Sequence, residues 1–155
     1  MATKEQIIDG LKYTVDQAKR TSAFFEDKEW DQKRPGGWTP KEILSHVAVT
    51  AATIQQAGQM LLGAPEGADV AAGMDIAAMN AAGVASMEAM APAQILQALE
   101  LNYGKWIEWV QGLPDDVLAQ KRTFLEYNIP VSDVLNNLTL HGLHHVYEAH
   151  LRVPL

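Results

Sequence analysis

The sequence contains no cysteine and few basic residues, and both features limit what the chain can do. Without cysteine, no disulfide crosslinks the fold, and no thiolate of the chain can serve as a nucleophile or as a metal ligand. Twelve Lys and Arg residues against nineteen Asp and Glu give a formal net charge of -7, which repels the phosphate backbone of nucleic acids. We therefore expect no nucleic-acid partner.

Long apolar runs are also missing. No stretch of about 18 apolar residues could span a bilayer. The first residues, MATKEQIIDGLKY, carry charges throughout and lack the apolar core of a signal peptide. We therefore expect a cytoplasmic protein with no membrane partner. The chain has 155 residues, of which 48% are hydrophobic, so it is long enough to bury one core, and we expect a single domain over residues 1–155.

Four segments place apolar residues at steps of three and four, which is the spacing of an amphipathic helix. Thr3 with Gln6, and Thr39 with Glu42, form capping boxes that indicate where the first two helices begin. Pro40 is suited to the first position of the second helix. The expected long helices cover residues 4–26, 40–62, 92–112 and 131–151. Four such helices predict an all-α four-helix bundle.

The segments between these helices carry weaker signals. EDKEWDQKRPGGW has no helical period and is expected to be a loop. Residues 63–90 are rich in Ala and Gly, and they predict a loop followed by a short helix near 75–88; a connection of this length often shapes a pocket. Residues 114–130 are expected to be a connector with a helical turn around 115–119. No segment predicts a strand.

Four of the five histidines lie in the last predicted helix, within HGLHHVYEAH at residues 141–150. A helical wheel places His141 and His145 on the inward side and His144 and His150 toward the flanks. Because residues four apart share one helical face, His141 and His145 can reach a single metal ion.

The fifth histidine, His46, lies at the edge of the apolar stripe of the second helix. If the second and fourth long helices are neighbours, three imidazoles converge and leave coordination positions open, which is typical of a catalytic metal site. The simpler alternative is that these histidines are packed in the core and hydrogen-bonded to neighbouring groups.

Two motifs resemble those of the DinB-like (YfiT-like) metal-dependent superfamily. GGWTPKEILSHV is similar to the family's W-S/T-P-x-E-I/L-L-x-H stretch, and HGLHHVYEAHLR is similar to its second signature, two histidines four apart. The resemblance covers about the whole chain. It implies a four-helix bundle, often a homodimer, that binds nickel, zinc or a similar divalent ion through His46, His141 and His145. Characterised relatives include thiol-dependent S-transferases and isomerases that use bacillithiol, mycothiol or glutathione.

The chain departs from the family pattern at one place. It has Val146-Tyr147-Glu148 where relatives often have Arg-Gly-Gln after the last ligand. Glu148 lies three residues beyond His145, where it could act as a catalytic general base or orient a ligand imidazole. The alternative for Glu148 is a solvated carboxylate at the end of a helix.

Three functions fit these observations. The first is a metal-dependent enzyme acting on a small molecule, either a thiol-dependent S-transferase or a related hydrolase or isomerase. A three-histidine centre can lower the pKa of a bound water or hold a thiol as thiolate, and any thiol must come with a cosubstrate because the chain has no cysteine. The second is a non-catalytic stress-response bundle that binds a metal or a small ligand. The third is a helical dimer whose histidines are merely packed.

Overall fold

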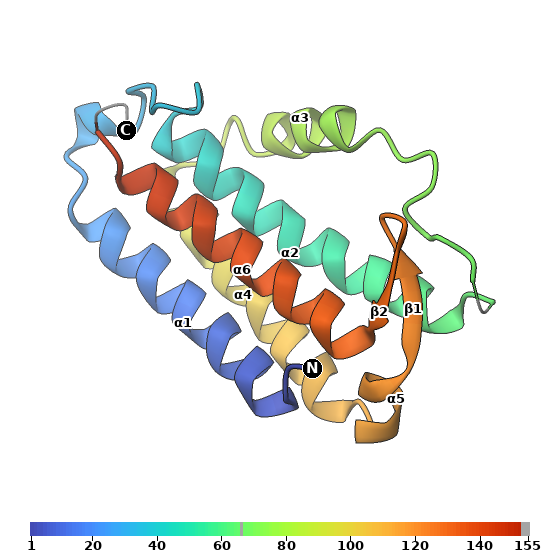
Figure 1. The fold of residues 1–155 in the computed structure, drawn as a ribbon. Helices are drawn as coiled ribbons and strands as arrows, with labels where there is room; N and C mark the ends of the chain where they lie inside the picture. The colour runs from blue at the N-terminus through green and yellow to red at the C-terminus, as the bar shows by residue number, and fades with distance from the viewer. Residues whose placement is uncertain (66, 153–155) are drawn as a thin grey trace.

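The computed structural model describes residues 1–65 and 67–152, and it shows four long helices with smaller elements at their edges (Figure 1). The long helices are α1 (Lys4–Ala23), α2 (Pro40–Gly63), α4 (Pro92–Gly112) and α6 (Val131–His150). The smaller elements are the 3-10 helix η1 (Asp27–Glu29), α3 (Ile76–Ser86), α5 (Asp115–Ala119), β1 (Lys121–Phe124) and β2 (Tyr127–Pro130). The expected bundle is confirmed, including the short helix between the second and third long helices.

The long helices are arranged as a square in which each helix contacts two others. α2 packs against α4 and α6, and α1 packs against the same two helices. α1 and α6 run in one direction, whereas α2 and α4 run in the opposite direction (Figure 1). Consecutive helices α1 and α2 therefore occupy opposite corners. This arrangement makes α2 and α6, which carry the histidines, direct neighbours.

The predicted capping boxes are present at both helix starts. The Thr3 hydroxyl accepts from the backbone N–H of Gln6, whose side chain accepts from the backbone N–H of Thr3. Thr39 and Glu42 make the same reciprocal pair at the start of α2. Each box satisfies backbone donors that have no partner inside the helix, so it fixes where the helix begins.

The core lies between the four long helices, where the predicted apolar stripes meet. Its largest fully buried side chains include Ile7, Leu11, Ile43, Leu44, Leu61, Ile95, Leu99, Tyr103, Trp106 and Leu135. Among the described residues, no helix combines the length and the apolar composition needed to cross a membrane.

The prediction that the chain contains no strand is wrong at residues 121–130, where β1 and β2 form an antiparallel hairpin. Its two turn residues, Leu125 and Glu126, have positive φ angles of 49° and 68°. Gly, Asn and Asp usually occupy such positions, so the sequence gives no turn signal here. The carboxylate of Asp69 stabilises the turn by accepting the backbone N–H groups of Leu125 and Glu126, at 3.2 and 2.8 Å.

The first helix ends at Ala23, earlier than the predicted end at residue 26. Phe25 belongs to the apolar stripe in the sequence, but in the structure its ring packs edge-on against Trp30, with centroids 4.9 Å apart. Phe25 therefore packs within the loop that follows α1 and not on the inward face of the helix.

We expect Gly142→Ala to lower the free energy of unfolding by about 1–3 kcal/mol, as overpacking of a core does. A Cβ atom at Gly142 would collide with the hydroxyl oxygen of Tyr103, which reaches across the bundle and is itself fully buried. Urea denaturation measures the effect. Gly104→Ala is the control, because its Cβ meets no atom within 4 Å and alanine favours a helix. Equal stability of Gly142→Ala and the unmodified protein would contradict the close packing.

Candidate metal centre

The three predicted ligands meet between α2 and α6. His46 lies in the first half of α2 and is 3% exposed, while His141 and His145 lie one turn apart on α6. One potential ligand atom from each histidine lies within 4.8 Å of the other two. The Nε2 atoms of His46 and His141 are 3.3 Å apart. The sequence-based condition for a shared site, adjacency of the second and fourth long helices, is therefore met.

The other two histidines lie where the helical wheel places them. His144 and His150 are exposed on the flanks of α6. The wheel is less accurate for His141, whose side chain stays exposed because it lines a cavity beside the bundle. His144 also forms a second group with His145 and Glu148, again with ligand atoms within 4.8 Å of one another, but this group lies at the surface side of the helix.

Desolvation keeps two of the converging imidazoles neutral. Burial is the main cause that lowers the pKa of His46 to about 4, and the charges of His145 and His141 act in the same direction. Burial also lowers the pKa of His141, with smaller contributions from His145 and His144. Because a metal binds the neutral imidazole, these rings are in the ligand form at neutral pH without losing a proton.

Hydrogen bonds to the Nδ1 atoms orient two of the rings. Nδ1 of His145 lies 2.8 Å from Oε2 of Glu148, and both side chains are only 16% exposed. When Nδ1 donates its proton to this carboxylate, the lone pair of His145 is on Nε2. The hydroxyl of Thr50 lies 3.3 Å from Nδ1 of His46, where it can accept the Nδ1 proton and leave the lone pair on Nε2. Glu148 is therefore not a solvated helix-end carboxylate; its contact is that of a positioning residue, and the general-base role stays a prediction.

The loop before α2 covers the site on one side. A Cβ atom at Gly36 would collide with Oε1 of Glu148, so the glycine leaves room for the carboxylate beside the loop backbone. The ring of Trp38 lies against two of the histidines, with centroid distances of 4.9 Å to His46 and 6.2 Å to His145. Gly36 and Trp38 belong to the family-like motif, but the sequence alone gives no sign that they contact Glu148 and the predicted ligands.

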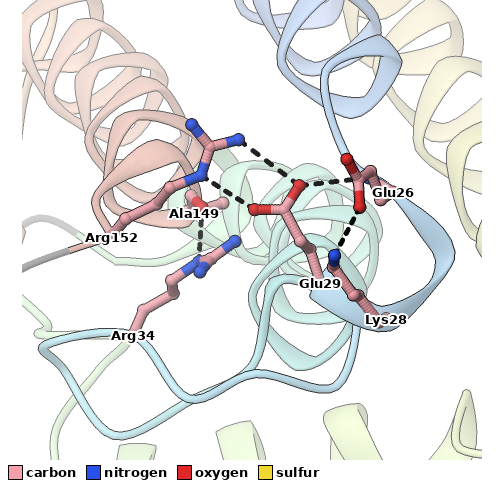
Figure 2. A network of polar contacts seen from close by, with 6 residues as sticks. All are labelled: Glu26, Lys28, Glu29, Arg34, Ala149 and Arg152. Atoms are coloured by element: carbon pink, nitrogen blue, oxygen red, sulfur yellow. Dashed lines mark hydrogen bonds and ion pairs between the residues drawn. The ribbon is translucent and has the colours of Figure 1, made fainter.

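A polar network attaches this loop to the end of α6 (Figure 2). Arg34 is 5% exposed, and its Nε donates to the backbone oxygen of Ala149 at 2.9 Å. Its backbone N–H also donates to the carbonyl of Trp38 at 2.7 Å. Arg152, just after α6, pairs with Glu29 in η1 at 2.8 Å. These contacts hold the loop over the turn of α6 that carries His145 and Glu148.

The donor set fits a divalent transition metal. Nitrogen ligands about 2.0–2.1 Å from a tetrahedral zinc ion lie about 3.3 Å from one another. The separation of 3.3 Å between the Nε2 atoms of His46 and His141 matches that spacing. Neutral imidazoles suit zinc, nickel, copper and iron, so the residues fit the group without selecting one ion.

Acid should destabilise the metal-free protein through His46. The unfolded histidine has a pKa near 6.5 and the folded one a pKa of about 4, so the unfolded chain binds more protons between these values. Stability therefore falls as the pH is lowered from 6.5 toward 4. We expect urea denaturation in EDTA to show a shallower pH dependence for His46→Gln than for the unmodified protein or for His150→Gln. Equal slopes in all three proteins would contradict the lowered pKa.

We expect Gly36→Ala to weaken zinc binding at least about tenfold, because loss of an outer partner of a ligand histidine costs about 10–100-fold in affinity. The added methyl group displaces the end of the flexible Glu148 side chain, and the φ angle of Gly36 is not positive, so the fold should tolerate it. Glu148→Ala should have the same effect. Competition with a chromophoric chelator measures the affinity, with Gly63→Ala as control, whose Cβ meets nothing within 4 Å. Unchanged affinity in Gly36→Ala would show that this contact does not position His145.

Comparisons with known proteins agree with the fold. No curated protein matches the chain. A solved structure described as YfiT from Bacillus subtilis, a probable metal-dependent hydrolase with an unusual four-helix bundle topology, matches with a TM-score of 0.69 at 20% identity. The match covers 94% of this chain and 83% of that one, and at this identity it shows the fold. The sequence profile of the DinB superfamily matches residues 14–149, and the chain therefore belongs to the DinB superfamily.

Proposed function

We propose that the chain binds one divalent cation, nickel or zinc, through His46, His141 and His145 and acts as a metal-dependent enzyme on a small molecule. The convergence of three imidazole nitrogens from two separate helices carries this proposal. Structural zinc sites are usually closed by four protein ligands, whereas catalytic sites keep three protein ligands and an open position. The three-histidine group corresponds to the second arrangement.

Each surrounding residue has a separate task in this proposal. A bound divalent cation would lower the pKa of a coordinated water toward neutrality or hold a thiol as thiolate. His46 and His141 offer neutral nitrogens, since burial lowers their pKa values. Glu148 fixes the ring of His145 through Nδ1. Trp38 lies against the histidines on the loop side, so reactants approach through the cavity that His46 and His141 line.

Hydrolysis is the reaction that we favour, because it requires only water and an electrophilic small molecule at the open position. The description of YfiT as a probable metal-dependent hydrolase supports the same reaction class. Thiol-dependent transfer is the second candidate, supported by the family-like motifs. It would need a low-molecular-weight thiol as cosubstrate, because the chain has no cysteine. A homodimer stays a prediction from the same motifs.

Calorimetric titration of tag-free protein with Zn²⁺ or Ni²⁺ tests the metal site. We expect one equivalent to bind, and we expect His46→Ala, His141→Ala and His145→Ala each to weaken binding by about a hundredfold or more, as loss of one of three ligands should. His150→Ala is the matched control, because His150 is an exposed histidine of the same helix outside the cluster. If less than about a tenth of an equivalent binds, the packed-histidine alternative holds.

Turnover is tested separately on the metal-loaded protein. We expect hydrolysis of uncharged 4-nitrophenyl esters to depend on the metal and to be lost in His141→Ala but not in His150→Ala. A parallel assay supplies each common low-molecular-weight thiol with an electrophilic chloroarene and follows thioether formation. Full metal occupancy with no turnover in either assay would favour the non-catalytic binding bundle.

A further inference from the structure

A cavity of about 670 Å³ opens beside the candidate metal centre. Its lining comes from α2, α3, α6, the β1–β2 hairpin and the segment 67–75. His46 and His141 both belong to the lining. A molecule held in this cavity therefore lies next to the ring nitrogens of two of the three candidate ligands.

The lining of this cavity is apolar, and no charged side chain among the described residues contributes to it. Val49, Phe124 and Leu138 are typical of its surface. Apart from the two histidines and Tyr127, its polar members are the neutral residues Thr50, Thr53, Asn80 and Asn137. Apart from a cation held by the histidines, a ligand with a carboxylate or an ammonium group would find no opposite charge in this lining, and burying an unpaired charge is strongly unfavourable.

Four large apolar side chains of the lining are exposed, namely Ile76, Met79, Leu125 and Tyr127. They come from α3 and from the hairpin, so they gather from two elements that are distant in the sequence. Exposed apolar side chains that gather around a concave surface are typical of a ligand site, because a ligand removes them from water.

Asp69 holds two parts of this lining together. Its carboxylate accepts the backbone N–H of Ala71 at 2.9 Å and those of Leu125 and Glu126 at 3.2 and 2.8 Å. These hydrogen bonds lower the pKa of the Asp69 carboxyl, so it stays ionised and occupied by backbone donors. The segment 67–75 and the hairpin are thereby joined.

A second cavity, of about 910 Å³, differs from the first in the charge of its lining and in its position relative to the histidines. It is lined by the charged residues Asp31, Lys41, Glu42 and Glu88, and none of the three converging histidines lines it. A charged ligand bound there would not touch their ring nitrogens. The uncharged cavity is therefore the one that gives access to the candidate metal centre.

We infer that the cavity beside His46 and His141 binds an uncharged, apolar part of the substrate, such as an acyl chain or an aromatic ring. The adjoining reactive group of that substrate then lies at the histidines. This inference rests on the proposed function for the chemistry, although binding of the apolar part requires no metal. Glutathione and other thiols with several charged groups are not suited to this cavity, which favours hydrolysis of an apolar ester or amide over transfer from such a thiol.

The neutral fluorophore N-phenyl-1-naphthylamine probes the cavity directly. We expect saturable binding with increased, blue-shifted fluorescence in both zinc-loaded and EDTA-treated protein. In the EDTA-treated protein, 1-octanol should displace the probe at a concentration at least tenfold lower than octanoate, which has the same chain length and a negative charge. Equal or better displacement by octanoate would overturn the inference, and so would the absence of saturable binding.

A matched pair of variants locates the probe. Met79→Glu places a negative charge on α3 at the lining, at a side chain that is 42% exposed. Met60→Glu makes the same change on α2 at a side chain that is 55% exposed and outside both cavities. We expect Met79→Glu to weaken probe binding at least tenfold and Met60→Glu to change it less than twofold, with circular dichroism showing both folded. Equal effects would overturn the inference.

These measurements separate the inference from the proposed function. Probe binding that follows the expected pattern in a protein that binds neither zinc nor nickel would support the cavity and reject the metal-dependent enzyme. Zinc binding by the three histidines without saturable probe binding would contradict the inference that the cavity binds an apolar group, but it would not contradict the proposed metal site.

Discussion

Because α2 packs along α6, the Nε2 atoms of His46 and His141 lie 3.3 Å apart, and His145 stands one turn further along α6. The same contact buries His46, and desolvation is the main cause that lowers its pKa to about 4. Desolvation is also the main cause that lowers the pKa of His141, although part of that side chain faces the cavity. Packing therefore has two effects. It brings the Nε2 atoms of His46 and His141 to the spacing of ligands around one ion, with a ring nitrogen of each of the three histidines within 4.8 Å of the other two. It also favours the neutral forms of His46 and His141. The proposed chemistry depends on both.

Two other parts of the chain complete the surroundings of these rings, and each acts from a different side. The loop before α2, attached to the end of α6 through Arg34, places the backbone of Gly36 beside Glu148 and so supports the contact with His145. On the cavity side, Asp69 joins the hairpin to the segment 67–75 and shapes an uncharged lining next to His46. The ligand histidines are therefore oriented by polar contacts on one side and open to an apolar volume on the other.

The parts of the structure that could be predicted from sequence are those set by local rules. The helix starts at Thr3 and Thr39 follow from reciprocal side-chain caps, and the inward face of α6 follows from its period. The hairpin could not be predicted, because the turn at Leu125 depends on Asp69, far away in the sequence. The role of Gly36 was hidden for the same reason, since it is defined by a side chain more than a hundred residues later. Both features depend on contacts between residues far apart in the sequence, which local sequence patterns do not reveal.

The most direct test of the central claim is a metal-edge anomalous difference map of crystals of tag-free protein loaded with its native ion or with zinc. We expect one peak between α2 and α6, with nitrogen atoms of His46, His141 and His145 at about 2.0–2.1 Å and at least one further position open to solvent. A peak only at the second group, His144, His145 and Glu148, or no peak at full zinc saturation, would contradict this expectation.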